Sequence, residues 1–119
     1  MSTGYHEQGL SQETQSIHRA LASLQEELEA TDWYHQRIDV AEDEELKDIL
    51  AHNRNEEIEH AMMLLEYLRR KMPEFDTHLR TYLFTSKPIT ELEDEEEGEG
   101  GEAEESAGSD GSLGIGGLS

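Results

Sequence analysis

The chain has 119 residues, of which 29 are acidic and nine are Lys or Arg, and its formal net charge is -20 at pH 7. This acidity excludes the basic surfaces that bind nucleic-acid phosphates, and it disfavours an anionic membrane surface. Without cysteine there are no disulfides or thiolate ligands, and no apolar run approaches the roughly 20 residues that span a bilayer. Residues 1–10 lack the features of a secretion signal, so we expect a flexible N-terminus on a soluble cytoplasmic protein.

Residues 11–87 carry the apolar periodicity of helices and form the expected folded domain. The first helix should start at Ser11, which can cap it, with Glu13 in its first turn. Its apolar stripe runs from Ile17 to Ile38 in alternating steps of three and four. The stripe loses its register near residues 39–45, so the pattern predicts a turn there instead of one continuous helix.

A second helix should start near Asp43 and end at three basic residues, where cations favour a helix C-terminus. Pro73 then opens a short third helix with apolar residues at helical spacing. These apolar residues are Phe75, Leu79, Tyr82 and Leu83. We therefore predict an all-α fold, with an antiparallel two-helix hairpin plus a short C-terminal helix. A hairpin of this size struggles to form a core alone, so two copies should pair as a four-helix bundle.

Polar side chains interrupt both apolar stripes near their middles. Glu27 lies in the first stripe, and Asn53, Glu57 and His60 lie in the second. A turn centred near residues 41–42 places Glu27 and Glu57 side by side, each about 22 Å along its helix from the turn. Glu57 and His60 are three residues apart and share a face. One hairpin thus offers half of a di-iron carboxylate site, which a two-fold pair of hairpins would complete.

The same pattern also has a purely structural explanation. A chain with this many Glu and His residues contains about one Glu-x-x-His by chance, so the position of Glu57 and His60 in the stripe carries the argument. The alternative is a buried polar network that sets the register of a coiled-coil interface. His52, Glu56 and His60, four residues apart, form another candidate metal group, although the first two lie off the stripe.

The acidic residues 88–108 have almost nothing to bury, so we expect a disordered linker. Apolar residues reappear among glycines in residues 109–119. These are Leu113, Ile115 and Leu118.

Three blocks of the sequence resemble the encapsulated ferritins, the cargo of encapsulin nanocompartments. Residues 23–37 (SLQEELEATDWYHQR) are similar to the first helix of that family, and residues 52–66 (HNRNEEIEHAMMLLE) are similar to the second. Residues 111–118 (GSLGIGGL) look like the peptide that loads cargo into the shell. The resemblance implies that 109–119 is an encapsulin-targeting peptide, which should dock as a short extended segment through its three apolar residues.

The resemblance implies a ferritin-like ferroxidase that oxidises Fe(II) to Fe(III) with O2 and supplies iron for storage inside the shell. Its di-iron ligands would be Glu27, Glu57 and His60 from both chains of a dimer, with Tyr34 beside the centre. Three further positions match a metal-entrance site, where calcium is also expected. These are Glu26, Glu29 and Trp33. Dimers would assemble into a decameric ring inside the nanocompartment. The alternative function is a non-catalytic, metal-binding helical assembly protein.

Overall fold

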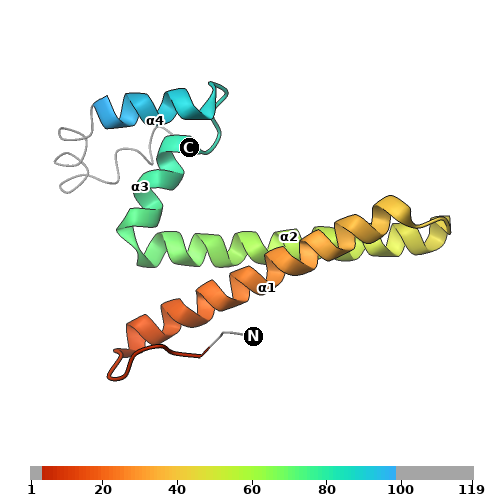
Figure 1. The fold of residues 1–119 in the computed structure, drawn as a ribbon, viewed down its shortest axis with the longest axis horizontal. Helices are drawn as coiled ribbons and strands as arrows, with labels where there is room; N and C mark the ends of the chain where they lie inside the picture. Colours follow the sequence, from red (N-terminus) through yellow and green to blue (C-terminus); the bar gives the residue numbers. More distant parts are fainter. Residues whose placement is uncertain (1–3, 99–119) are drawn as a thin grey trace. The chain divides into compact units, whose positions relative to one another are not determined.

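The computed structural model describes residues 4–98 of the chain. These residues form α1 (Gln12–Val40), α2 (Glu44–Lys71), α3 (Pro73–Tyr82) and α4 (Ile89–Gly98), as Figure 1 shows. The predicted all-α class is confirmed. None of the helices in the described part of the chain is long and apolar enough to cross a bilayer. The chain divides into two units, Met1–Lys71 and Met72–Ser119.

Side-chain caps start both long helices where the sequence indicates. The Oγ of Ser11 accepts a hydrogen bond from the backbone N–H of Thr14 at 3.1 Å, which satisfies one free donor of the first turn of α1. The Asp43 carboxylate accepts from the N–H groups of Glu45 at 2.9 Å and Leu46 at 3.2 Å. The two predicted helix starts are therefore confirmed.

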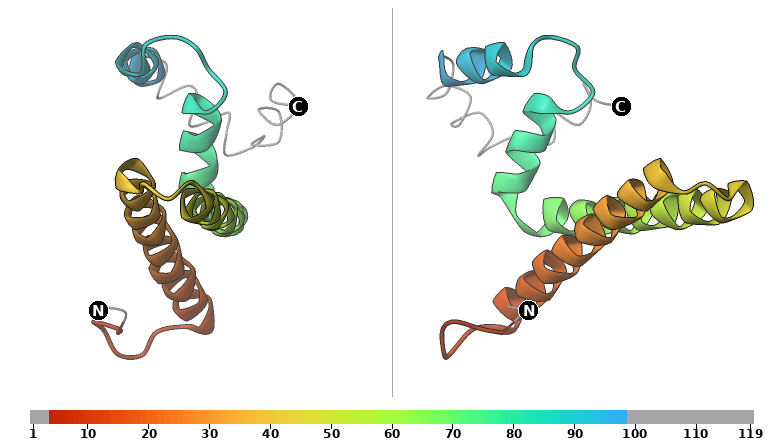
Figure 2. Two further views of the ribbon diagram at one scale, coloured as in Figure 1. Left: turned by 90° about the vertical axis from the view of Figure 1, so that its right-hand side faces the viewer. Right: turned by 45° about the vertical axis from the view of Figure 1, so that its right-hand side comes forward.

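Helices α1 and α2 form the predicted hairpin, running side by side in opposite directions from the turn at residues 41–43 (Figures 1 and 2). The buried side chains of these two helices are Ala20, Ala61 and Leu68. Such a thin core leaves large apolar side chains exposed on the hairpin, which is typical of an interaction surface. These exposed residues include Leu28, Leu46, Ile49, Ile58, Met62 and Met63.

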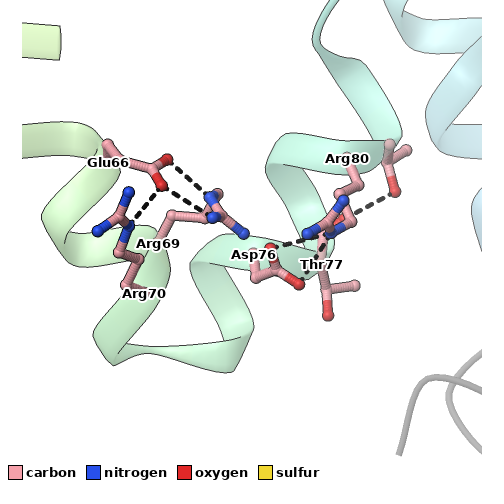
Figure 3. Close-up of polar contacts among 7 residues, drawn as sticks. Glu66, Arg69, Arg70, Asp76, Thr77 and Arg80 are labelled. Carbon is pink, nitrogen blue, oxygen red and sulfur yellow. Dashed lines mark hydrogen bonds and ion pairs between the residues drawn. The ribbon is translucent and has the colours of Figure 1, made fainter. Parts of the chain in front are cut away.

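The last turns of α2 hold an ion-pair cluster, shown in Figure 3. Arg69 donates to both carboxylate oxygens of Glu66, at 2.7 and 2.8 Å, and Arg70 donates to one of them at 2.7 Å. These hydrogen bonds, from Arg69 first and then Arg70, lower the pKa of Glu66 to about 2. The basic residues thus stabilise this carboxylate as well as the C-terminal end of the helix dipole.

Replacing Glu66 by glutamine is expected to destabilise the hairpin slightly at pH 7, by less than about 1 kcal/mol because the pair is solvent-exposed. Since the pKa of Glu66 in the folded protein lies below the ordinary 4.5, its stabilisation is complete above pH 4.5 and disappears as the pH falls to about 2. Denaturant unfolding in chelator should therefore show the two proteins converging in acid. An equal difference at pH 7 and pH 2 would contradict this, and Glu59→Gln, at an exposed position of α2, is the control.

The second unit begins at Met72, the N-cap of α3, and Pro73 takes the first position of that helix, as predicted. Phe84 follows α3 with a left-handed φ of 61°, which redirects the chain before α4. Helix α4 corrects the expectation of a disordered linker over 88–108 for its first part. The carbonyl of Pro88 accepts from the N–H groups of Glu91 and Leu92, while Leu92 is buried to 9% exposure. The prediction rested on how little the acidic segment can bury, and it overlooked the burial of Leu92. Residues 99–108 lie outside the described part.

The second unit gains one more ordering contact near the start of α4. Lys87 forms a 3.0 Å ion pair with Glu95, so one base before the helix offsets one of its acids. Glutamate is also a good helix former, which favours a helix wherever an anchor restrains the segment.

Candidate metal centre

The hairpin brings Glu27 of α1 next to Glu57 and His60 of α2. One ligand atom from each of the three lies within 4.8 Å of the others. His60 Nδ1 is 3.2 Å from Glu57 Oε1 and 3.5 Å from Glu27 Oε1. Glu57 and His60 share a face because they are one helical turn apart, and the antiparallel pairing sets Glu27 at their level. The structure thus places together the three residues that the sequence indicates.

The protonation of this group reflects the crowding of its two carboxylates. The pKa of Glu27 is raised, first because a proton can be shared with Glu57, then by burial and by the negative charge of Glu57. Burial lowers the pKa of His60, but its hydrogen bond to Glu57 and the charges of both carboxylates outweigh this and leave the pKa raised. The group therefore attracts positive charge, either as protons or as a cation.

The chemistry and geometry of the three side chains fit a transition-metal ion. Oxygen Oε1 of Glu27 is buried and accepts no hydrogen bond from the described residues, since His60 Nδ1, at 3.5 Å, makes only an ion-pair contact with it. A buried carboxylate oxygen without a partner is costly, and a cation would remove that cost. Ligand atoms about 2.0–2.2 Å from one ion are at most about 4.4 Å apart. The observed spread of 4.8 Å therefore requires a shift of well under an ångström.

One hairpin supplies only part of a coordination shell. Three side-chain ligands are fewer than the six of an octahedral oxygen-rich site. The side chain of His60 is 47% exposed, whereas that of Glu27 is 26% exposed, so the group opens to solvent on the side of His60. The exposed Leu46 lies on the same helical stripe, because positions 46, 53 and 60 are seven apart. The face of α2 that carries His60 therefore also carries an exposed apolar residue nearer the turn.

Tyr34 lies on the stripe of Glu27, about 10 Å further along α1 at 1.5 Å per residue. It is half-buried, and the guanidinium of Arg37 lies 5.3 Å from its ring centroid. This cation–π contact fixes the ring beside the hairpin surface. Tyr34 is thus placed two helical turns from the carboxylates and does not belong to the group of three.

The residues expected at a metal entrance share an exposed stripe of α1. Glu26, Glu29 and Trp33 are three and four residues apart, and all three are exposed. Among the described residues, the group able to hold a metal contains none of them. It also omits His52 and Glu56, so the alternative group on α2 does not form around His60.

A second polar contact between the helices was not evident from the sequence. Arg54 of α2 donates to Nδ1 of His35 in α1 at 3.1 Å. Within α1, the hydroxyl of Thr31 donates to the backbone carbonyl of Glu27 at 2.8 Å. The seven-residue spacing of stripes could not reveal the first contact, since both residues lie beside the apolar stripes. It joins the helices one turn before Glu57.

The helical hairpin and its carboxylate–histidine group are consistent with a ferritin-like helical protein. Residues 3–86 match the EncFtn-like family model, and the chain belongs to the EncFtn-like family. It is 56% identical over 100 residues to a "Ferritin-like protein" of Thermotoga maritima, covering 82% of this chain and 88% of the relative. It is 54% identical over 114 residues to an "Encapsulated ferritin-like protein" of Rhodospirillum rubrum, covering 92% and 81%. The resemblance of residues 23–37 and 52–66 to the encapsulated ferritins is thereby confirmed.

Among solved structures, the chain is similar to the crystal structure of a Nitrosomonas europaea protein. The TM-score is 0.70 and the sequence identity 61%, and the match covers 72% of this chain and 97% of that one. The hairpin fold is therefore shared with an experimentally solved relative.

Proposed function

We propose that this protein is a ferroxidase whose di-iron site is completed when two copies pair. The observation that carries the proposal is the group of Glu27, Glu57 and His60, in which a buried carboxylate oxygen accepts no hydrogen bond from the described residues. Oxygen-rich ligation with one imidazole suits iron, and the family's curated relatives are named as ferritin-like.

Pairing of two hairpins as a four-helix bundle would place the open sides of two such groups against each other. Two copies contribute four carboxylates, whose charge balances two divalent ions. The exposed Leu46 and Ile49 lie on the same side of α2 as His60, several turns nearer the start of the helix. Their burial between two copies would supply the apolar core that one hairpin lacks. The same contact therefore closes the site and stabilises the fold.

Each side chain then has a distinct role toward the substrate, ferrous iron. Glu27 and Glu57 neutralise the charge of two ferrous ions and hold them close together, while His60 of each copy gives a nitrogen ligand. Each pair of bound ions would supply two electrons, which with two protons from solvent reduce one O2 to hydrogen peroxide, and the ions would leave as iron(III). Tyr34, whose ring contacts Arg37, would position the side chains around this centre without binding iron itself.

The exposed stripe of Glu26, Glu29 and Trp33 is proposed as the place where cations arrive before they reach the centre. Its carboxylates would hold Fe(II) or Ca²⁺ weakly, because hard cations favour oxygen ligands. The net charge of -20 would raise the local concentration of cations around the whole protein.

We further propose that the dimers form a decameric ring, which works as cargo inside an encapsulin nanocompartment in the cytoplasm. Ile58 and Met62, four apart and exposed, form an apolar stripe of α2 separate from that of Leu46. Two such stripes let one hairpin contact two neighbours, as a ring requires. The residues proposed to bind the shell lie outside the described residues. These are Leu113, Ile115 and Leu118.

An anaerobic Fe(II) titration followed by a pulse of O2 tests the proposal, with oligomer mass and oxidation rate recorded on the same sample. We expect two irons per dimer, a mass increase on iron binding, and oxidation well above the protein-free rate. Iron binding and assembly without faster oxidation would favour the non-catalytic assembly protein. Binding at one iron per chain without pairing would contradict the shared site.

A further inference from the structure

The second unit presents an apolar surface that the ferroxidase centre does not use. Six side chains of α3 and its C-terminal cap line an open groove of about 380 Å³ with an apolar lining, here named the α3 groove. They are Glu74, Phe75, His78, Leu79, Tyr82 and Leu83. Phe84, 90% exposed, extends the apolar surface past the helix end. An open apolar surface of this kind indicates a binding site.

The opposite face of α3 is polar and satisfied within the helix. Arg80 donates to both carboxylate oxygens of Asp76, at 2.9 and 3.0 Å (Figure 3). Thr81 donates to the carbonyl of Thr77 at 3.1 Å. A ligand with apolar side chains would therefore bind in the α3 groove and not on this face.

We propose that the α3 groove holds the C-terminal segment 109–119 of the same chain. After α4 ends at Gly98, this segment is the part of the remaining sequence that carries leucine or isoleucine. Leu113 follows Gly98 by 15 residues, which reach at most about 50 Å and span about 20 Å as a flexible coil. Helix α3 has 10 residues and is about 15 Å long, so the tether easily reaches the groove.

The tether favours the chain's own segment over a separate copy. A short flexible connection gives an effective concentration on the order of 1 mM, so even a millimolar affinity fills the groove about half of the time. Gly114, Gly116 and Gly117 let the backbone approach a helix face and turn, which allows Leu118 to join Leu113 in the groove. Free copies at micromolar concentration would compete about a thousandfold less well.

Docking would hide the three apolar residues that are proposed to bind the shell. The significance of this competition rests on the proposed cargo function, but the docking itself requires neither shell nor iron. The C-terminal segment would thus be held by α3 until a stronger site displaces it.

The absence of native cysteine allows a direct test in the full chain. The double variant His78→Cys, Ser112→Cys places one thiol in the groove and one in the C-terminal segment. The control variant Thr77→Cys, Ser112→Cys places the first thiol on the polar face of α3 and keeps the tether length the same. Equilibration with glutathione measures the effective concentration of each thiol pair. We expect it to be at least tenfold higher for the groove pair, and to fall to the control value when Leu113, Ile115 and Leu118 are replaced by serine.

Three outcomes would overturn the proposal. Equal effective concentrations for the two pairs would mean that the tether alone brings the thiols together. An effective concentration of the groove pair that stays unchanged after the three serine replacements would show that the groove does not recognise the apolar residues. A disulfide between two chains, seen as a dimer on a denaturing gel, would assign the groove to a second copy. Because the assay is free of iron and shell protein, its failure is distinct from failure of the ferroxidase or cargo proposals.

Discussion

Replacing Glu27 by glutamine is expected to reduce the rate of iron(II) oxidation by about a hundredfold or more, toward the protein-free rate. Even residues that only support a metal ligand change affinity or activity by about 10- to 100-fold, so loss of a ligand oxygen should cost at least as much. Stopped-flow measurement of Fe(III) formation after mixing with O2 gives the rate. Glu59→Gln, which removes one exposed charge from α2, is the matched control and should oxidise iron normally.

The same variant should not lose its fold. The pKa of Glu27 is raised first by its hydrogen bond with Glu57, then by burial and by the negative charge of Glu57, so the metal-free hairpin favours an uncharged side chain at this position, and a neutral amide supplies one. We expect an unchanged or higher unfolding temperature in chelator, together with the loss of oxidation. Rapid oxidation in Glu27→Gln would refute the assignment of this ligand, and a lower unfolding temperature would refute the argument that the metal-free hairpin favours an uncharged side chain at position 27.

Replacing Leu68 by alanine is expected to lower the free energy of unfolding by about 2–5 kcal/mol. Leu68 is fully buried in a hairpin core that otherwise consists of alanines, so neighbouring side chains cannot refill the cavity easily. A unit of this size has a total stability of only about 4–10 kcal/mol, so the loss would be a large share of it. Denaturant unfolding at fixed protein concentration, with chelator present, measures the difference.

Met63→Ala is the control for that experiment, because Met63 is on the same helix but 64% exposed. It should change the free energy of unfolding by less than about 0.5 kcal/mol. If the two variants were equally destabilised, the core would lie elsewhere in the assembled protein, and burial within one hairpin would not determine stability.

Together the two variants separate the site from its scaffold. Glu27→Gln should abolish rapid oxidation without lowering the unfolding temperature, whereas Leu68→Ala should lower the free energy of unfolding. The separation follows from position, since Leu68 lies eight residues beyond His60 on α2, about 12 Å along the helix.

The sequence by itself determined the hairpin and the position along it at which Glu27 lies opposite Glu57. Helix starts are local, because Ser11 and Asp43 cap their own first turns, and the loss of stripe register located the turn. Equal distances from that turn were sufficient to set Glu27 level with Glu57. These features depend on spacing along the chain, which helical geometry converts directly into position. The role of these residues in iron oxidation stays a prediction.

The tertiary structure decided which side chains meet and which are buried, because residue spacing along the chain does not determine these contacts. Whether the Glu27 oxygen has a partner, and how Arg54 meets His35, depend on side-chain rotamers and on how closely two helices approach. Helix α4 formed against the charge pattern, because the burial of Leu92 depends on a neighbouring element that periodicity does not identify. The α3 groove likewise appears only when α3 is folded with its apolar side exposed. The sequence specified elements and their register, and packing decided which polar atoms and apolar faces remain available for binding.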